Sequence, residues 1–133
     1  MKTVLIVEDS RMVRTITERD LTRAGYRVIT AADGEQGLQS ARQNTPNLIL
    51  LDMLLPKLAG LDVLRELKSD NRTKCIPVII LTSLSSSNAE KLAAEGAAGF
   101  YEKSDESLKS GSKLVDLTQS ILAKRQGLET KPV

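Results

Sequence analysis

The chain has 133 residues and a hydrophobic content of 41%, which suits one domain with a buried core. Nineteen Lys and Arg residues against 17 Asp and Glu residues give a net charge of +2, and the basic residues are scattered, so direct binding to nucleic acid is not favoured. No apolar stretch approaches the roughly 20 residues that span a bilayer. Because the lone Cys75 also suits a reducing compartment, we expect a cytoplasmic protein that contacts no membrane.

The N-terminal part of the chain alternates a short apolar run with a helical pattern. Residues 4–7 are a predicted strand, and Ser10 can cap the helix that follows, which Gly25 ends. Residues 27–31 form the second predicted strand, and a second helix is predicted from 35 to about 43.

The middle of the chain repeats this alternation. Residues 47–51 and 78–81 are predicted strands, with a helix at about 60–68 between them. Their runs are apolar at every position, which is typical of parallel strands that are buried on both faces.

The last predicted elements are a helix, a strand and a helix. Ser87-x-x-Glu90 matches a capping box that would begin the fourth helix, and Gly96 would end it. Residues 99–102 are a short predicted strand, and 113–124 have the apolar spacing of a final helix.

Five strand–helix units in strict alternation predict an α/β fold with a parallel sheet and helices on both faces. Five units favour a flavodoxin-like doubly wound open sheet of order 2-1-3-4-5 over a barrel, which would need eight. The domain would cover residues 1–124, and residues 125–133 would be a disordered tail too short to fold.

Polar residues follow the predicted strands at one edge of this sheet. Glu8 and Asp9 follow the first strand, and Asp52 follows the third. Thr82 and Lys103 end the runs of the fourth and fifth strands. Because the first and third strands are neighbours in this order, the three carboxylates would meet in the crevice where such folds bind ligands. Each residue alone is more simply a loop or cap residue, so their joint placement indicates the site.

Three clustered carboxylates repel each other at neutral pH and need a proton or a cation. The chain has no His and one Cys, which excludes a soft-metal site, and Mg²⁺ suits the oxygen ligands. With an ammonium and a hydroxyl opposite, Asp52 could be the nucleophile of a phosphoryl transfer.

Four segments resemble the receiver domain of response regulators in two-component signalling, whose familiar single-domain member is the chemotaxis response regulator. They are Ile6-Val7-Glu8-Asp9-Ser10, Asp52-x-x-x-Pro56-x-x-x-Gly60, Thr82-Ser83 and Lys103, and the resemblance covers about residues 2–124. It implies a signalling switch that promotes only its own phosphorylation and dephosphorylation, and not an enzyme with a separate substrate.

The resemblance also implies roles for the acidic residues. Asp52 is the expected phosphoacceptor. Asp9, Asp52 and the backbone carbonyl of Leu54 are expected to bind Mg²⁺ directly, and Glu8 to act through a coordinated water.

Other implied roles concern the phosphoryl group and the switch. Thr82 and Lys103 are expected to bind the phosphoryl group, and the small Ser83 to leave room for it. Phe100 matches the family's aromatic switch position, although it could simply be a strand residue packed on the last helix.

Some positions depart from the family pattern. Ser104 stands where the family usually has Pro, so we expect a trans peptide bond after Lys103 and an altered path of the following loop. Leu54 and Leu84 occupy rim positions that influence the lifetime of the phosphoryl group. Neither side chain can orient a water, so slow self-hydrolysis is predicted.

The absence of His implies an external donor, a histidine kinase or a histidine phosphotransfer protein. Output would pass to a downstream protein through the fourth helix, the fifth strand and the last helix.

Two alternative functions remain: an Mg²⁺-dependent aspartyl-phosphate hydrolase, and an interaction module with a degenerate acidic site. The hydrolase would need a second acid where Leu54 stands and a cap over the substrate. The degenerate module would lack at least one of the five polar groups.

Overall fold

The structure is a computed structural model that describes residues 1–82, 89–103 and 112–130. Its strands are β1 (Thr3–Val7), β2 (Arg27–Ala31), β3 (Leu48–Asp52), β4 (Val78–Thr82) and β5 (Gly99–Glu102). Its helices are α1 (Arg11–Arg23), α2 (Gly34–Asn44), α3 (Gly60–Ser69), α4 (Ala89–Ala94) and α6 (Ser112–Thr130). None of these helices is long and apolar enough to cross a membrane.

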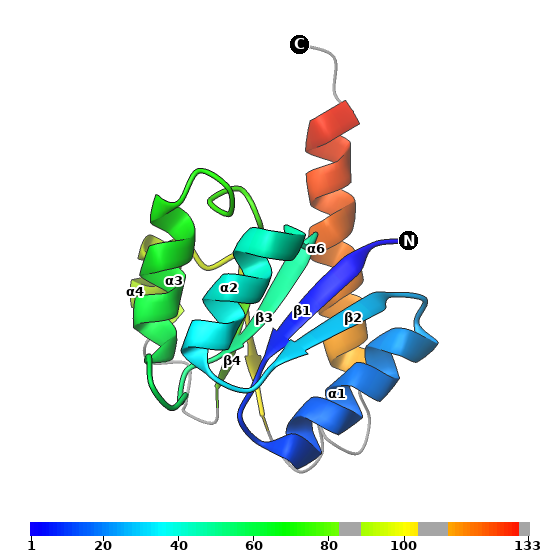
Figure 1. Ribbon diagram of the computed structural model, residues 1–133. Helices are drawn as coiled ribbons and strands as arrows, with labels where there is room; N and C mark the ends of the chain where they lie inside the picture. The colour runs from blue at the N-terminus through cyan, green and yellow to red at the C-terminus, as the bar shows by residue number, and fades with distance from the viewer. Residues whose placement is uncertain (83–88, 104–111, 131–133) are drawn as a thin grey trace.

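The strands form one parallel sheet in the predicted order, β2-β1-β3-β4-β5 (Figure 1). Val7 at the end of β1 pairs in register with Leu51 of β3, so the chain leaves both strands at the same edge. On the other side of β3, Asp52 lies opposite Leu81 of β4. The flavodoxin-like doubly wound fold is therefore confirmed, and its switch point lies between β1 and β3.

Helices cover both faces of the sheet, α1 and α6 on one side and α2, α3 and α4 on the other (Figure 1). Alternate strand residues serve the two layers, because successive side chains point to opposite faces. Leu5 and Val7 belong to the core under α2, α3 and α4, whereas Val4 and Ile6 belong to the core under α1 and α6. The strand runs are apolar throughout for this reason.

Local signals set the ends of the first helices. Ser10 begins α1, since its hydroxyl accepts a hydrogen bond from the Val13 amide at 3.3 Å. Gly25 follows that helix with a φ of +99°, a conformation that glycine adopts without steric cost. The carboxylate of Asp33 begins α2 in the same way, accepting from the Gln36 amide at 2.8 Å.

The last helix is longer than the sequence indicated. It continues past Lys124 to Thr130, and its C-terminal part extends beyond the sheet (Figure 1). Residues 125–130 are therefore helical instead of the expected tail, whereas the domain boundary itself stays a prediction. Gly127 does not stop the helix, because an interior Gly costs only about 1 kcal/mol relative to Ala. The predictions about Ser83, Leu84, Ser87, the Lys103–Ser104 bond and residues 131–133 fall outside the described residues.

Candidate functional site

The pairing of β1 with β3 brings the predicted acids together. The residues Glu8 and Asp52 are buried, with relative exposures of 0% and 3%, whereas Asp9 is exposed at the rim. One carboxylate oxygen from each of the three lies within 4.8 Å of the others. The structure thus places all three sequence-predicted carboxylates in one cluster at the C-terminal edge of the sheet.

Lys103 reaches this cluster from the end of β5. Its ammonium lies 3.0 Å from Glu8 Oε1 and 3.1 Å from Asp52 Oδ1. The backbone of Lys103 is held next to the end of β4, because its amide donates a hydrogen bond to the Thr82 carbonyl at 2.7 Å. A single cation therefore bridges the two buried carboxylates.

Burial decides the electrostatics of the cluster. Burial is the largest of the effects that together raise the pKa of Glu8 from 4.5 to about 7; the neighbouring Asp52 adds to the rise and Lys103 opposes it. Burial also disfavours the charged ammonium of Lys103, but its hydrogen bonds to Glu8 and Asp52 outweigh this and raise its pKa. The site therefore holds a permanent cation and a carboxyl group that titrates near neutral pH.

The sequence did not point to Arg14, which supports the loop after β1. Its guanidinium donates to the backbone carbonyl of Glu8 at 2.9 Å and to that of Asp9 at 3.4 Å. The Ser10 amide adds a bond to Glu8 Oε2 at 3.2 Å. The available signal was the position of Arg14 one helical turn after the Ser10 cap, which directs a side chain back over the loop.

The loop after β3 touches the phosphoacceptor candidate directly. The Leu54 amide donates to Asp52 Oδ1 at 3.3 Å, and the Leu54 side chain is 66% exposed. Gly60 lets α3 begin against this turn, since a Cβ there would lie 2.5 Å from the Asp52 carbonyl oxygen. The expected role of the Leu54 carbonyl as a cation ligand stays a prediction.

Thr82 and Phe100 lie next to the cluster along the sheet. Thr82 ends β4 one residue beyond Leu81, the partner of Asp52, and it pairs with Glu102 immediately before Lys103. Phe100 is partly buried against the core under α2, α3 and α4. Their expected roles in phosphoryl binding and switching stay predictions.

Comparisons with known proteins agree with this geometry. Residues 4–110 match the response regulator receiver domain. The chain belongs to the response regulator receiver domain family. One relative is the transcriptional regulatory protein AfsQ1 of Streptomyces coelicolor, which is 45% identical over 62% of this chain and 36% of its own length. Another is the alkaline phosphatase synthesis transcriptional regulatory protein PhoP of Bacillus subtilis, which is 37% identical over 75% of this chain and 41% of its own length. The chain thus spans about two fifths or less of these relatives.

Solved structures of receiver domains show the same architecture. The chemotaxis response regulator CheY4 of Vibrio cholerae superimposes with a TM-score of 0.76 at 30% identity, covering 86% of this chain and 98% of that one. The receiver domain of a signal transduction histidine kinase from Syntrophus aciditrophicus gives a TM-score of 0.84 at 26% identity, covering 100% and 98%. The recognised family therefore assigns this receiver domain to two-component phosphorelay signalling.

The donor set of this receiver domain fits a hard divalent cation. Three carboxylates within 4.8 Å offer oxygen ligands, and the side chain of Asp9 is accessible from solvent. Mg²⁺ prefers such ligands and keeps several waters, which an open rim allows. The bridging ammonium of Lys103 offsets only part of the negative charge, so the cluster can accept a further cation.

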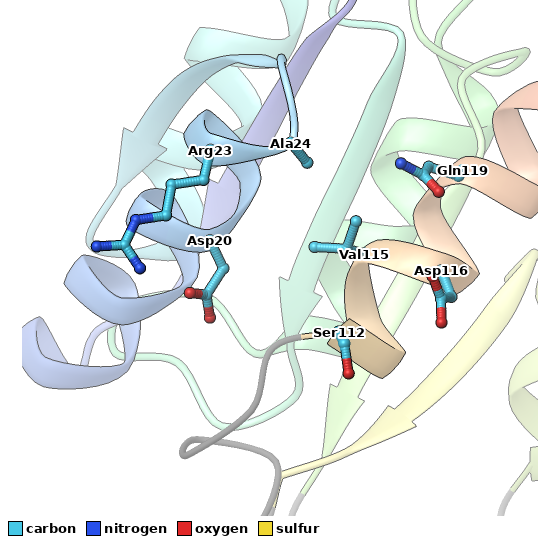
Figure 2. Close-up of a pocket in the computed structure, with 7 residues that line it drawn as sticks. All are labelled: Asp20, Arg23, Ala24, Ser112, Val115, Asp116 and Gln119. Atoms are coloured by element: carbon cyan, nitrogen blue, oxygen red, sulfur yellow. The ribbon is translucent and has the colours of Figure 1, made fainter.

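A second concave region of the receiver domain lies apart from the acids. It has a volume of about 320 Å³ and lies between the end of α1 and the start of α6 (Figure 2). Asp20, Arg23 and Ala24 line one wall, and Ser112, Val115, Asp116 and Gln119 line the other. Neither the three carboxylates nor Lys103 belong to its lining, so it is separate from the candidate site.

Proposed function

We propose that this receiver domain accepts a phosphoryl group on Asp52 from a phosphohistidine of a partner protein, with Mg²⁺ bound beside it. The observation that carries the proposal is the Lys103 ammonium, which contacts the carboxylates of both Glu8 and Asp52 at the sheet edge. A nucleophile, a fixed cation and a set of acidic ligands are thereby combined in one partly open site.

The chemistry follows from these groups. A carboxylate oxygen of Asp52 attacks phosphorus, the bond from phosphorus to the donor's imidazole nitrogen breaks, and that nitrogen keeps the electron pair and takes a proton from solvent. The product is an acyl phosphate on Asp52. Lys103 and the hydroxyl of Thr82 would stabilise the oxygens of the transferred group.

The acidic residues would hold the metal ion. Asp9, Asp52 and the Leu54 carbonyl would be its direct ligands, and Glu8 would act through a bound water. When bound, Mg²⁺ supplies positive charge next to the phosphoryl oxygens. Ligation favours the ionised form of the acids, so the raised pKa of Glu8 opposes loading at low pH.

Partners follow from the chemistry of the donor. The 133 residues contain no His, so a histidine kinase or a histidine phosphotransfer protein would supply the phosphohistidine. Response regulators interact with histidine kinases, which supports this assignment. We further propose that the phosphorylated form presents a changed surface of α4, β5 and α6 to a downstream protein, with Phe100 as the moving side chain.

Intact mass after incubation with acetyl phosphate and Mg²⁺ tests the proposal. We expect one added phosphoryl group on the native chain, none on Asp52→Asn, and none with EDTA present. Asp20→Asn is the matched control, because Asp20 lies on α1 outside the site and its loss should leave labelling unchanged. Undiminished labelling of Asp52→Asn would refute the assignment.

A further inference from the structure

The loop between β3 and α3 contains a rare backbone turn. Lys57 has a φ of +68°, and the Leu58 amide donates across it to the Pro56 carbonyl at 2.8 Å. A γ-turn with positive φ is uncommon and strained, and a residue with a Cβ persists in it only when its surroundings hold it there.

Two contacts with the start of α2 hold this turn. The Lys57 ammonium lies 3.5 Å from Asp33 Oδ2; the Asp33 side chain is only 8% exposed, whereas the Lys57 side chain is 59% exposed. The other oxygen of Asp33 accepts from the Gln36 amide, so the carboxylate is fixed as the cap of α2. Gly34 is the second contact: it lets the loop pack closely against the start of α2, because a Cβ at this position would lie only 2.8 Å from the Cβ of Leu58.

The same loop reaches Asp52 at its other end. The Leu54 amide donates to Asp52 Oδ1 at 3.3 Å, and the Gly60 amide closes the loop on the Met53 carbonyl at 3.2 Å. The loop is therefore held at one end by an amide bond to the Asp52 side chain, at the other by a backbone bond to Met53, and in the middle by the ion pair of Lys57 with Asp33.

We propose that Asp33 and Lys57 are positioning residues whose ion pair holds the loop of residues 53–59, so that the Leu54 backbone is correctly placed against Asp52 and the metal ion. This inference rests on the function proposed for Asp52. Neither residue contacts the reacting atoms; both act through the loop, as residues behind a metal ligand commonly do.

Mg²⁺ titration of the unphosphorylated chain, followed by amide NMR, separates positioning from simple charge effects. Removing a cation near the acids should tighten Mg²⁺ binding, and removing an anion should weaken it, if only the electrostatic field matters. Positioning instead predicts that both Lys57→Met and Asp33→Asn weaken binding, each by about 10-fold. The Asn of Asp33→Asn can still cap α2. Lys57→Arg should retain the native Mg²⁺ affinity, because Arg can keep the ion pair with Asp33.

Arg65→Met is the matched control for the loss of an exposed ion-paired cation. Arg65 on α3 pairs with Glu95 through two bonds of 3.1 Å, away from the loop. Its loss should leave Mg²⁺ affinity unchanged. A purely structural role of Asp33 and Lys57 would lower the free energy of unfolding, measured in parallel, without changing Mg²⁺ affinity.

Amide hydrogen exchange of the metal-free protein keeps this test independent of the proposed function. In Lys57→Met the Leu58 amide should exchange at least several-fold faster than in the native chain, even if the native chain were to bind no Mg²⁺. Two results would overturn the inference: a Leu58 amide in Lys57→Met that exchanges at the native rate, or an Mg²⁺ affinity of Lys57→Met that equals or exceeds the native affinity. Absence of phosphorylation together with fast exchange would reject only the function of Asp52.

Discussion

Single residues of the site carry an energetic cost in the metal-free protein. Glu8 is fully buried between the Lys103 ammonium and the Ser10 amide, and burial raises its pKa to about 7. A group whose pKa is higher in the folded state than in the unfolded state binds more protons when folded. Its contribution to stability is therefore complete below its ordinary pKa of 4.5 and is lost as the pH rises through about 7.

Glu8→Gln should remove this pH dependence. Between about pH 5 and pH 8, without divalent cations, the native chain should lose on the order of 1–3 kcal/mol of unfolding free energy that the variant does not lose. Urea unfolding in EDTA at several pH values measures the difference. Glu102→Gln, at an exposed position of β5, should keep the native slope. Parallel curves for native and Glu8→Gln would contradict the raised pKa of Glu8.

A buried hydroxyl elsewhere offers a second test at this scale. Thr118 on α6 is fully buried, and within the described part of the chain its Oγ1 has no hydrogen-bond partner. Thr118→Val should therefore stabilise the protein by about 1 kcal/mol, because the unsatisfied group is replaced by an apolar one of similar shape. Thr73→Val is the opposite control: its hydroxyl donates to the Leu67 carbonyl at 2.7 Å, so its loss should destabilise. Equal destabilisation by both changes would show that Thr118 is satisfied.

At the scale of elements, close approach of α2 to the sheet sets the shape of the switch point. Gly37 faces β1, and a Cβ there would lie 2.8 Å from Val7 Cγ1. The end of β1 leads directly into Glu8, so a displacement of Val7 would reach the site. Gly37 therefore allows α2 to pack closely on β1, although Gly has a lower helix propensity than Ala.

Gly37→Ala should destabilise the protein by about 1–3 kcal/mol, because overpacking at Val7 exceeds the gain in helix propensity. Gln39→Ala, an exposed position on the same helix, should change the unfolding free energy by less than about 0.5 kcal/mol. Chemical denaturation of both variants measures this. A more stable Gly37→Ala would mean that α2 can move outward without loss of packing.

The sequence predicted the elements better than the contacts between loops. The ends of buried parallel strands share one edge, so Glu8, Asp52 and Lys103 could be placed together from their positions after apolar runs. The γ-turn at Lys57 and the support by Arg14 depend on loop geometry, which carries no periodic signal. The end of α6 was missed because the regular apolar spacing ends before Lys124 and Gly127 is a poor helix former, although one Gly does not force a stop.

At the scale of the whole molecule, β5 connects the site to both layers. Phe100 packs on the core under α2, α3 and α4, whereas the next residue, Tyr101, packs on the core under α1 and α6. Lys103 follows on the same strand end and contacts Asp52. A shift of Lys103 toward a phosphoryl group on Asp52 would therefore act on both layers through one short strand.

Addition of beryllofluoride, a phosphoryl mimic, with Mg²⁺ should change amide chemical shifts across residues 89–103 and 112–124 as well as around Asp52. We expect these changes because the mimic should draw Lys103 and Thr82 toward Asp52 and so shift the packing equilibrium of Phe100. Phe100→Ala should still bind the mimic but should lose most of the chemical-shift changes in residues 89–103 and 112–124. Leu61→Ala is the control and should keep these changes, because Leu61 is a partly buried residue on α3 that packs on the same core as Phe100. Shift changes confined to the residues around Asp52 in the native chain would contradict an output surface on α4, β5 and α6.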